Sequence, residues 1–256
     1  MNTLTIAIPC YRSEKYLRNT VEGILAEAHR QGRDDLRVLL VDDGSPDGTF
    51  QVIKELCVEH KGRVTGICLA ENAGQANARA AAFHFLRGGI TVLMDDDGQH
   101  DPRGIFRLEK KILDGYDLVY AQFPKMEEAP LRRLGSLSLD VFLALFTKKP
   151  RGLRITSFLA LSEPALLELK KYKSHHPFIG GWLFVHGYRA GGVLVRHRAR
   201  ETGRSNYTIK KLLLRAAELM FLFRLRPGKG SPPAFRIREI VGGYGKKNRA
   251  PSLRSE

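Results

Sequence analysis

The sequence is poor in cysteine, in long apolar runs and in any N-terminal targeting pattern. Only three of its 256 residues are cysteines, and no two of them form a CxxC pair. This usage disfavours a disulfide framework and a structural zinc site, and it suits a reducing compartment. No uncharged apolar run reaches the roughly 18–20 residues that a membrane-spanning helix needs. The first residues, MNTLTIAIPCYRSEK, lack the basic and apolar regions of a signal peptide.

Acidic residues are scarce in only one half of the chain. Residues 1–124 hold 15 Lys and Arg against 18 Asp and Glu, whereas residues 125–256 hold 27 against 9, and the net charge is +15. A strongly basic half is typical of proteins that meet a nucleic acid, a membrane surface or a phosphorylated substrate. The alternative is a basic surface that only aids solubility.

The first half alternates short apolar runs with segments of helical spacing. Strands are predicted at Leu4–Pro9, Arg37–Val41, Val64–Leu69, Ile90–Met94 and Asp117–Gln122. Helices are predicted at Glu14–His29, Phe50–Cys57, Ala73–Leu86 and Pro102–Leu113. This alternation indicates βαβ units and a parallel sheet. Further strands are predicted at Ile155–Leu161 and Gly191–Val195, and further helices at Leu137–Phe146, Glu163–Tyr172 and Thr208–Phe223.

Acidic and amide side chains follow the predicted strands. The carboxyl ends of parallel strands form the ligand crevice of such sheets, so these side chains are expected to gather there. Most of them are carboxylates, which repel one another unless a cation lies among them. Oxygen ligands of this kind suit Mg²⁺ or Mn²⁺. A solvated acidic turn is the alternative for the aspartate triplet. The residues are Asp42, Asp43, Glu71, Asn72, Gln75, Asp95, Asp96, Asp97 and Gln99.

Two of the loops have features that suit a nucleotide. A nucleobase needs polar acceptors and a flat apolar surface, which Asp43 with Pro9 and Tyr11 would supply. The segment ENAGQANARAA places small residues at a helix start, where a backbone can approach a ligand closely. Helix capping explains one of the carboxylates in VDDGSPDGT, but not a pair beside a neighbouring triplet.

Five segments together resemble those of family 2 glycosyltransferases with the GT-A fold. They are IPCYRSE, VDDGSPDGT, NAGQANA, MDDDGQHDP and RHRARETGRSNYTIKKLL, in that order, and the resemblance covers about residues 3–224. Within the family the chain is similar to the polyprenyl-phosphate glycosyltransferases. The resemblance implies an α/β GT-A fold for nucleotide-diphospho-sugars, with a mostly parallel central sheet flanked by helices and a Rossmann-like N-terminal half.

The domain expectation follows from this resemblance and from the charge pattern. We expect a single catalytic domain over residues 1–225, with a nucleotide-sugar and metal half at 1–124 and an acceptor half at 125–225. Residues 226–256 are basic and rich in Pro and Gly, and we expect them to form a flexible tail. The amphipathic helix near the end of the acceptor half either packs on the core or lies on a membrane surface.

The resemblance also implies roles for individual residues. The catalytic and metal-binding aspartate is Asp97, and Asp95 and Gln99 complete the metal set. Nucleotide-sugar binding is implied for Pro9, Tyr11, Glu14, Asp42, Asp43, Asn72, Gly74, Gln75, Asp95 and Asp96. Binding of the acceptor phosphate or the leaving diphosphate is implied for Arg198, Arg200, Arg204, Ser205 and Tyr207. The chain departs from the family at Ser13, where an acidic residue is usual, and at Ser157-Phe158-Leu159, where many members have Asp-Phe-Arg.

The implied reaction is inverting transfer of a sugar from a nucleotide-diphospho-sugar to a polyprenyl phosphate, assisted by Mg²⁺ or Mn²⁺. The metal offsets charge on the departing diphosphate, and arginines bring two phosphate-bearing substrates together. Such an enzyme is expected at the cytoplasmic face of the membrane, held by anionic lipid or by a separate membrane protein. Three alternatives stay open. They are transfer to a saccharide hydroxyl, which needs a general base, an inactive relative that binds a partner, and a nucleic-acid-binding protein. The acidic crevice disfavours the last, so no nucleic acid is expected.

Overall fold

The computed structural model describes residues 3–86, 88–123, 147, 149–172, 178–196 and 235–243. Several predictions therefore lie outside the described residues. These are the helices at Leu137–Phe146 and Thr208–Phe223, and the acceptor-site residues Arg198, Arg200, Arg204, Ser205 and Tyr207.

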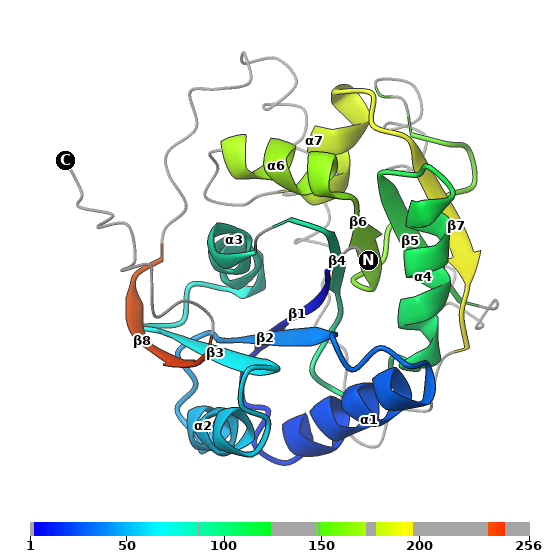
Figure 1. Cartoon of the computed structure of the whole chain (residues 1–256). Coiled ribbons are helices and arrows are strands. Elements are labelled where there is room, and N and C mark those ends of the chain that lie inside the picture. Colours follow the sequence, from blue (N-terminus) through cyan, green and yellow to red (C-terminus); the bar gives the residue numbers. More distant parts are fainter. Residues whose placement is uncertain are drawn as a thin grey trace, which may run out of the picture.

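An eight-stranded sheet runs through the described part of the chain, with strand order β7-β5-β6-β4-β1-β2-β3-β8 (Figure 1). The four central strands β4, β1, β2 and β3 are mutually parallel, as are β5 and β7, whereas β6 and β8 run antiparallel to their neighbours. The mostly parallel sheet expected from the sequence is thus confirmed. The strands are β1 Leu4–Cys10, β2 Arg37–Asp42, β3 Val64–Leu69, β4 Ile90–Leu93, β5 Leu118–Gln122, β6 Leu159–Leu161, β7 Ala190–Leu194 and β8 Ile237–Gly242.

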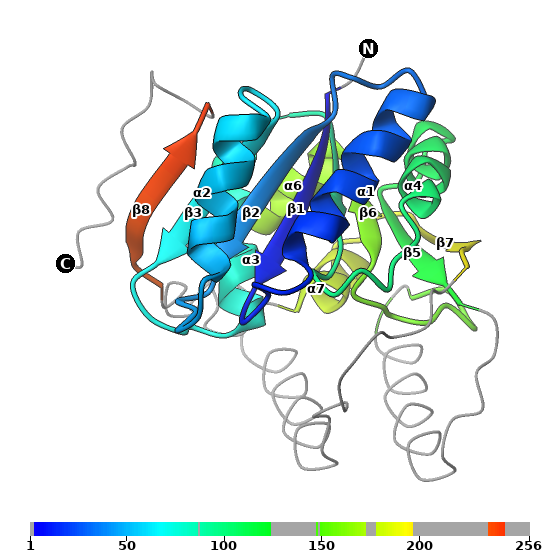
Figure 2. The ribbon, with the colours of Figure 1, turned by 90° about the horizontal axis from the view of Figure 1, so that it is seen from below.

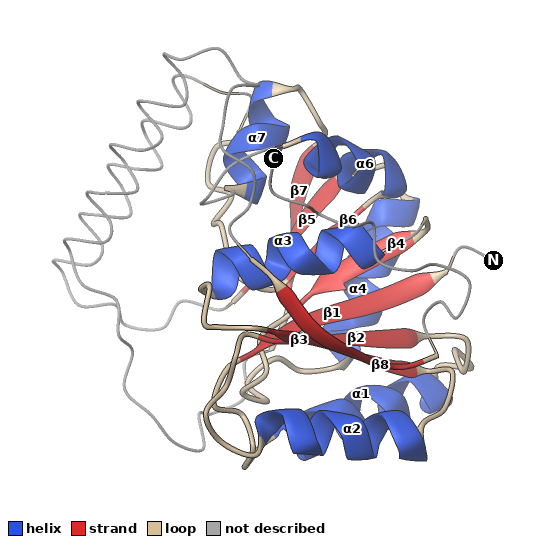
Figure 3. Cartoon of the chain, turned by 90° about the vertical axis from the view of Figure 1, so that its left-hand side faces the viewer, coloured by secondary structure: helices blue, strands red, loops and turns tan. Residues whose placement is uncertain are grey.

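Helices cover both faces of the sheet (Figure 3). One face packs on α1, α2 and α4, and the other on α3, α6 and α7. Strands covered on both faces are apolar throughout, which is why β1 reads as the continuous run LTIAIPC and is buried along its whole length. The helices are α1 Leu17–Arg30, α2 Thr49–Glu59, α3 Gln75–Phe85, α4 Arg103–Leu113, α6 Glu163–Lys171 and α7 Ile179–Val185.

Most boundaries lie within two residues of the prediction, and three larger differences remain. Helix α1 begins three residues later than predicted, because Ser13 to Tyr16 form a turn closed by the Tyr16 N–H donating to the Ser13 carbonyl at 3.1 Å. Strand β6 is shorter than the predicted Ile155–Leu161. Helix α7 was not predicted, since its sequence IGGWLFV contains two glycines, which disfavour helix.

The prediction of a flexible tail over residues 226–256 is wrong for β8. This strand pairs antiparallel with β3, and the Lys54 ammonium of α2 lies 3.2 Å from the Glu239 carboxylate. Its apolar side chains Ile237 and Val241 pack against the two core layers. The strand was overlooked because it is short and its flanking sequence is basic and rich in Pro and Gly. Its apolar residues Ile237, Ile240 and Val241 also do not follow the regular alternation of a strand.

Candidate active site

The carboxyl ends of the central strands meet at one edge of the sheet, where the predicted site residues lie. Figure 2 shows the β1 and β5 arrows pointing to this edge and the β8 arrow pointing away from it. The loops after β1, β2, β3 and β4 are neighbours there, as expected for parallel strands. Pro9 lies buried within β1, paired with Val41 of β2, just before the first of these loops. Hydrogen bonds between the loops define the candidate site.

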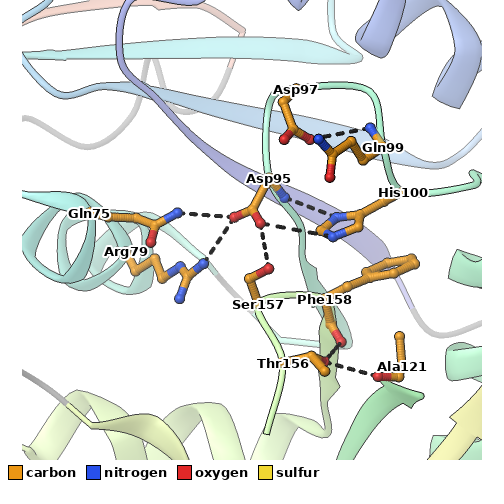
Figure 4. A network of polar contacts seen from close by, with 10 residues as sticks. All are labelled: Gln75, Arg79, Asp95, Asp97, Gln99, His100, Ala121, Thr156, Ser157 and Phe158. Carbon is orange, nitrogen blue, oxygen red and sulfur yellow. Dashed lines mark hydrogen bonds and ion pairs between the residues drawn. The ribbon is translucent and has the colours of Figure 1, made fainter. Parts of the chain in front are cut away.

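Asp95 lies at the centre of a network of donors (Figure 4). Its Oδ1 accepts hydrogen bonds from Gln75 Nε2 at 3.0 Å and from Arg79 Nη2 at 3.2 Å, both from α3. Its Oδ2 accepts from the hydroxyl of Ser157, in the segment that leads into β6. The structure therefore brings the predicted residues Gln75 and Asp95 together. It also adds Arg79, whose cation offsets part of the negative charge and which the sequence analysis missed.

His100 is a second residue that the sequence analysis missed. It is buried, and its Nδ1 accepts a hydrogen bond from the backbone N–H of Asp95 at 3.2 Å. The proton of the neutral ring therefore lies on Nε2, which is 3.8 Å from Asp95 Oδ2. The ring stacks on Phe158, with centroids 4.6 Å apart and an angle of 13° between the planes. His100 thus holds the backbone at which the aspartate triplet begins.

Asp96 points toward the β1 loop instead. Its Oδ2 accepts hydrogen bonds from the Tyr11 N–H at 3.2 Å and from the hydroxyl of Ser13. Burial raises the pKa of Asp96 to about 6, although these two donors act in the opposite direction. Ser13 is fully buried, and its own N–H donates to Thr49 Oγ1 at 2.7 Å. The serine at the family's usual acidic position is therefore part of a link between three loops, which no pattern in the sequence indicated.

Asp97 is the least engaged carboxylate of the triplet. The described contact of its side chain is one hydrogen bond, from the Gln99 N–H to Oδ1 at 3.2 Å. The Gln99 side chain lies beside it in Figure 4, and its Nε2 is buried with no hydrogen-bond partner among the described residues. The remaining lone pairs of the Asp97 carboxylate suit a hard cation, whereas the unsatisfied Gln99 Nε2 is an N–H donor and suits an acceptor such as a phosphate oxygen. The predicted metal residues Asp97 and Gln99 thus lie together.

Asp42 and Asp43 point to different loops. Both are almost inaccessible, with exposed fractions of 0% and 2%. Asp42 accepts hydrogen bonds from the Ser45 N–H and from the Cys68 thiol, each at 3.2 Å. The first of these holds the start of the β2–α2 loop. Asp42 therefore links this loop to β3 through Ser45 and Cys68.

Asp43 ties the β3–α3 loop to β2. Its two oxygens accept from the N–H groups of Ala73 and Gly74 at 2.8 and 2.9 Å. Burial raises the pKa of Asp43, and the two N–H donors partly offset the rise. Gly44, at φ +63°, packs so closely that a Cβ there would lie 2.6 Å from the carbonyl carbon of Glu71. The predicted residues Asn72 and Gly74 lie in the β3–α3 loop, and Asn72 is exposed.

Glu14 supports the start of α2. Its carboxylate accepts a hydrogen bond from the Gly48 N–H at 3.1 Å, and Asp47 accepts from the Thr49 N–H at 3.2 Å. This contact accounts for Glu14 without a ligand. Asp47 thus holds the first N–H of α2, whose N-cap residue is Gly48.

Trp182 of α7 packs on a neighbouring aromatic residue. The Trp182 ring stacks on Tyr172, with centroids 4.3 Å apart, which fits a core role for Trp182. No helix within the described residues is long and apolar enough to cross a membrane.

The comparisons with known proteins agree with this arrangement. The chain is 28% identical over 243 residues to an undecaprenyl-phosphate 4-deoxy-4-formamido-L-arabinose transferase of Shewanella sediminis, which covers 94% of this chain and 70% of that protein. It is 25% identical over 245 residues to the protein of the same name from Pseudomonas fluorescens, covering 94% and 69%.

Solved structures show the same fold at low sequence identity. A glucosyl-3-phosphoglycerate synthase of Mycobacterium tuberculosis, in complex with Mn²⁺, UDP-glucose and phosphoglyceric acid, matches with a TM-score of 0.59 at 19% identity, covering 87% of this chain and 79% of that one. A mannosyltransferase of Pyrobaculum calidifontis, in complex with GDP-Man and Mn²⁺, matches with a TM-score of 0.61 at 17% identity, covering 91% and 66%. The fold is therefore that of the GT-A glycosyltransferases. Residues 5–160 match the sequence model described as "Glycosyl transferase family 2", and the chain belongs to this family of glycosyltransferases.

Proposed function

We propose that the chain transfers a sugar from a nucleotide-diphospho-sugar to a polyprenyl phosphate with the help of a divalent cation. The observation that carries the proposal is the division of the aspartate triplet. Asp96 is bonded to the β1 loop and Asp95 to α3, while Asp97 keeps carboxylate sites free at the edge of the sheet. Transferases that act on undecaprenyl phosphate share about a quarter of their residues with most of this chain, which supports the choice of acceptor.

The residues at the edge of the sheet fit a hard divalent cation. Asp97 and the amide oxygen of Gln99 would hold Mg²⁺ or Mn²⁺, while the buried, unsatisfied Nε2 of Gln99 would donate to an oxygen of the diphosphate. Asp95 already accepts hydrogen bonds from Gln75, Arg79 and Ser157, so its share in the metal set depends on its remaining lone pairs. Such a cation, when bound, neutralises charge that builds up on a departing diphosphate.

The transfer step itself needs no proton transfer by a side chain. The bond between the anomeric carbon and the diphosphate oxygen breaks, and its electron pair leaves with the diphosphate. A phosphate oxygen of the lipid forms the new bond from the opposite face, which inverts the anomeric centre. A phosphate monoester is anionic near neutral pH, so no side chain has to remove a proton. The chain must instead offset repulsion between phosphates, a task that suits arginine.

Binding of the acceptor is proposed for the basic segment that follows β7. This segment contains Arg198, Arg200, Arg204, Ser205 and Tyr207. Contact with the cytoplasmic face of the membrane is proposed because a polyprenyl phosphate resides in the bilayer and because residues 125–256 carry a large excess of Lys and Arg. We further propose that residues 1–225 act, together with β8, as one catalytic domain.

The test uses the full chain, a panel of UDP- and GDP-sugars, and undecaprenyl phosphate in detergent. We expect sugar in the organic phase only when Mn²⁺ or Mg²⁺ is present, and loss of product when EDTA is added. Transfer to water-soluble saccharides but not to the lipid would contradict the proposed acceptor. Full turnover in EDTA would contradict the proposed cation.

A further inference from the structure

A fifth segment reaches the edge of the sheet beside the four loops of the candidate site. Strand β8 begins next to the end of β3, where Leu69 pairs with Ile237 and the Ala70 N–H donates to the Arg236 carbonyl at 2.7 Å. The start of β8 thus lies beside the carboxyl end of β3 and one strand away from that of β2. None of the predicted site residues comes from this part of the chain.

The pairing of β3 with β8 is irregular at this point. Cys68 pairs with Glu239, but Leu69, the next residue, pairs with Ile237. Arg238 is therefore an extra residue on β8, and the register shift is a β-bulge. A bulge changes the direction of the side chain it carries, and bulges are common next to active sites.

The bulge turns Arg238 toward the α2 side of the sheet. Its guanidinium carbon lies 5.7 Å from the centre of the Phe50 ring, at the start of α2. The neighbouring Glu239 faces the same helix through its contact with Lys54. Adjacent residues of a regular strand point to opposite faces, so the shared direction of these two side chains is a consequence of the bulge.

Arg238 is connected to the loops of the candidate site through Cys68. Burial and the bond to Asp42 together raise the pKa of the Cys68 thiol to about 12, whereas the nearby Arg238 guanidinium acts in the opposite direction. Asp42 in turn accepts from the Ser45 N–H, and the Ser45 hydroxyl accepts from the Arg12 N–H at 3.1 Å. Arg238, which lies between the β8 partners of Cys68 and Leu69, is thus next to a chain of hydrogen bonds that leads from Cys68 to the β1 loop.

An ionised carboxylate offers acceptors and no donor, so Asp42 and Asp43 do not supply the donor that a carbonyl oxygen of a base needs. Asp42 and Asp43 are almost inaccessible and are bonded to protein groups, whereas Arg238 is exposed. A guanidinium carries N–H donors and no acceptor. It therefore bonds to a carbonyl oxygen and is mismatched to an amino group at the same position.

We propose that Arg238 recognises the base of the donor nucleotide and favours uracil or guanine over cytosine or adenine. The inference rests on the proposed function, because it assumes a nucleotide donor at this edge. For a base held in one orientation, uracil O4 and guanine O6 present a carbonyl where cytosine and adenine present an amino group. Arg238 donates to this oxygen, and the bulge in β8 supplies the required direction.

The test measures binding of UDP, GDP, CDP and ADP to the full chain by calorimetry in the presence of Mn²⁺. We expect UDP or GDP to bind at least about 10-fold more tightly than the other two, since a hydrogen bond from a charged donor contributes about 1.5–3 kcal/mol. Arg238→Leu retains apolar contact with Phe50 and should lose this preference, with CDP and ADP affinities changed less than about 2-fold.

Arg236→Leu is the matched control, because Arg236 is also exposed, carries the same charge and lies two residues away. It should bind all four nucleotides like the unchanged protein. Melting temperatures of both variants without nucleotide show whether β8 remains in place. Unchanged selectivity in Arg238→Leu overturns the inference, as does an equal loss for all four nucleotides or an equal loss in Arg236→Leu. If the unchanged protein binds none of the four, the proposed function itself fails.

Discussion

The backbone N–H of Asp95 donates a hydrogen bond to Nδ1 of His100, five residues further along the chain, at 3.2 Å. This bond closes the loop that carries Asp96, Asp97 and Gln99. The His100 ring is itself held against Phe158, so the position of the loop depends on packing between β4 and the segment leading into β6. Oxygen ligands must be placed within a fraction of an ångström to be effective, and a stacked, buried ring provides such a fixed support.

Replacing His100 should impair catalysis more than folding. His100→Phe keeps an aromatic ring against Phe158 but leaves the Asp95 N–H without its acceptor, at a cost of about 1–3 kcal/mol. We expect kcat/KM to fall about 10-fold or more as the loop loses its support, mostly through kcat. Steady-state kinetics with varied donor and urea unfolding measure the two effects. His100→Asn keeps an acceptor and should recover part of the activity. Equal activity in His100→Phe and the unchanged protein would contradict the positioning role.

Asp97 should be the most sensitive position for metal-dependent turnover. Asp97→Asn removes a negative charge from the carboxylate that has the fewest protein contacts in the triplet, and we expect turnover to fall by about 100-fold or more. Calorimetry with Mn²⁺ and UDP should show a parallel loss of metal affinity. Asp114→Asn is the control, because Asp114 is exposed at the end of α4. Retained turnover in Asp97→Asn would remove this residue from the metal set.

The stability of the metal-free protein should decrease as the pH rises from about 4 to about 6. Burial raises the pKa of Asp96 to about 6, so the folded protein keeps a proton that the unfolded chain releases at lower pH. The destabilising contribution is therefore absent below the unfolded pKa and complete above the folded one. Urea unfolding at several pH values in EDTA measures this slope.

Asp96→Asn tests the assignment of that slope. An asparagine oxygen still accepts from Tyr11 and Ser13, but the side chain does not titrate. The pH dependence between about 4 and 6 should become shallower in this variant. If the slope is identical in both proteins, another group is responsible for it.

Gly44 should be required for the close packing of the loops that follow β2 and β3. Gly44→Ala places a Cβ 2.6 Å from the backbone of Glu71 in addition to the left-handed backbone cost of about 1–2 kcal/mol. Gly32→Ala is a matched control, since Gly32 has a similar φ of +66° but no neighbour within 4 Å of the added Cβ. We expect the melting temperature to fall clearly more in Gly44→Ala than in Gly32→Ala. Equal shifts would show that the close approach to Glu71 is relieved at no cost.

The sequence by itself determined the order of the central elements and the edge at which the site lies. Continuous apolar runs such as LTIAIPC and VLM predict strands that are covered on both faces. The carboxyl ends of neighbouring parallel strands lie at the same edge of the sheet. The gathering of Asp42, Asp43, Asp95 and Asp97 at one edge follows from that rule alone. Local patterns are sufficient for this because they reflect periodicity and chain direction.

The tertiary structure decided which partner each side chain has. Neighbouring aspartates point to different loops, Ser13 joins Asp96 to α2, and His100 supports Asp95 through a ring stacked on Phe158. The tertiary structure also placed β8 beside β3, from a segment that resembles a basic tail. These contacts join residues up to 177 positions apart, as in the pairing of Thr65 with Gly242, and they depend on packing geometry that no local pattern encodes.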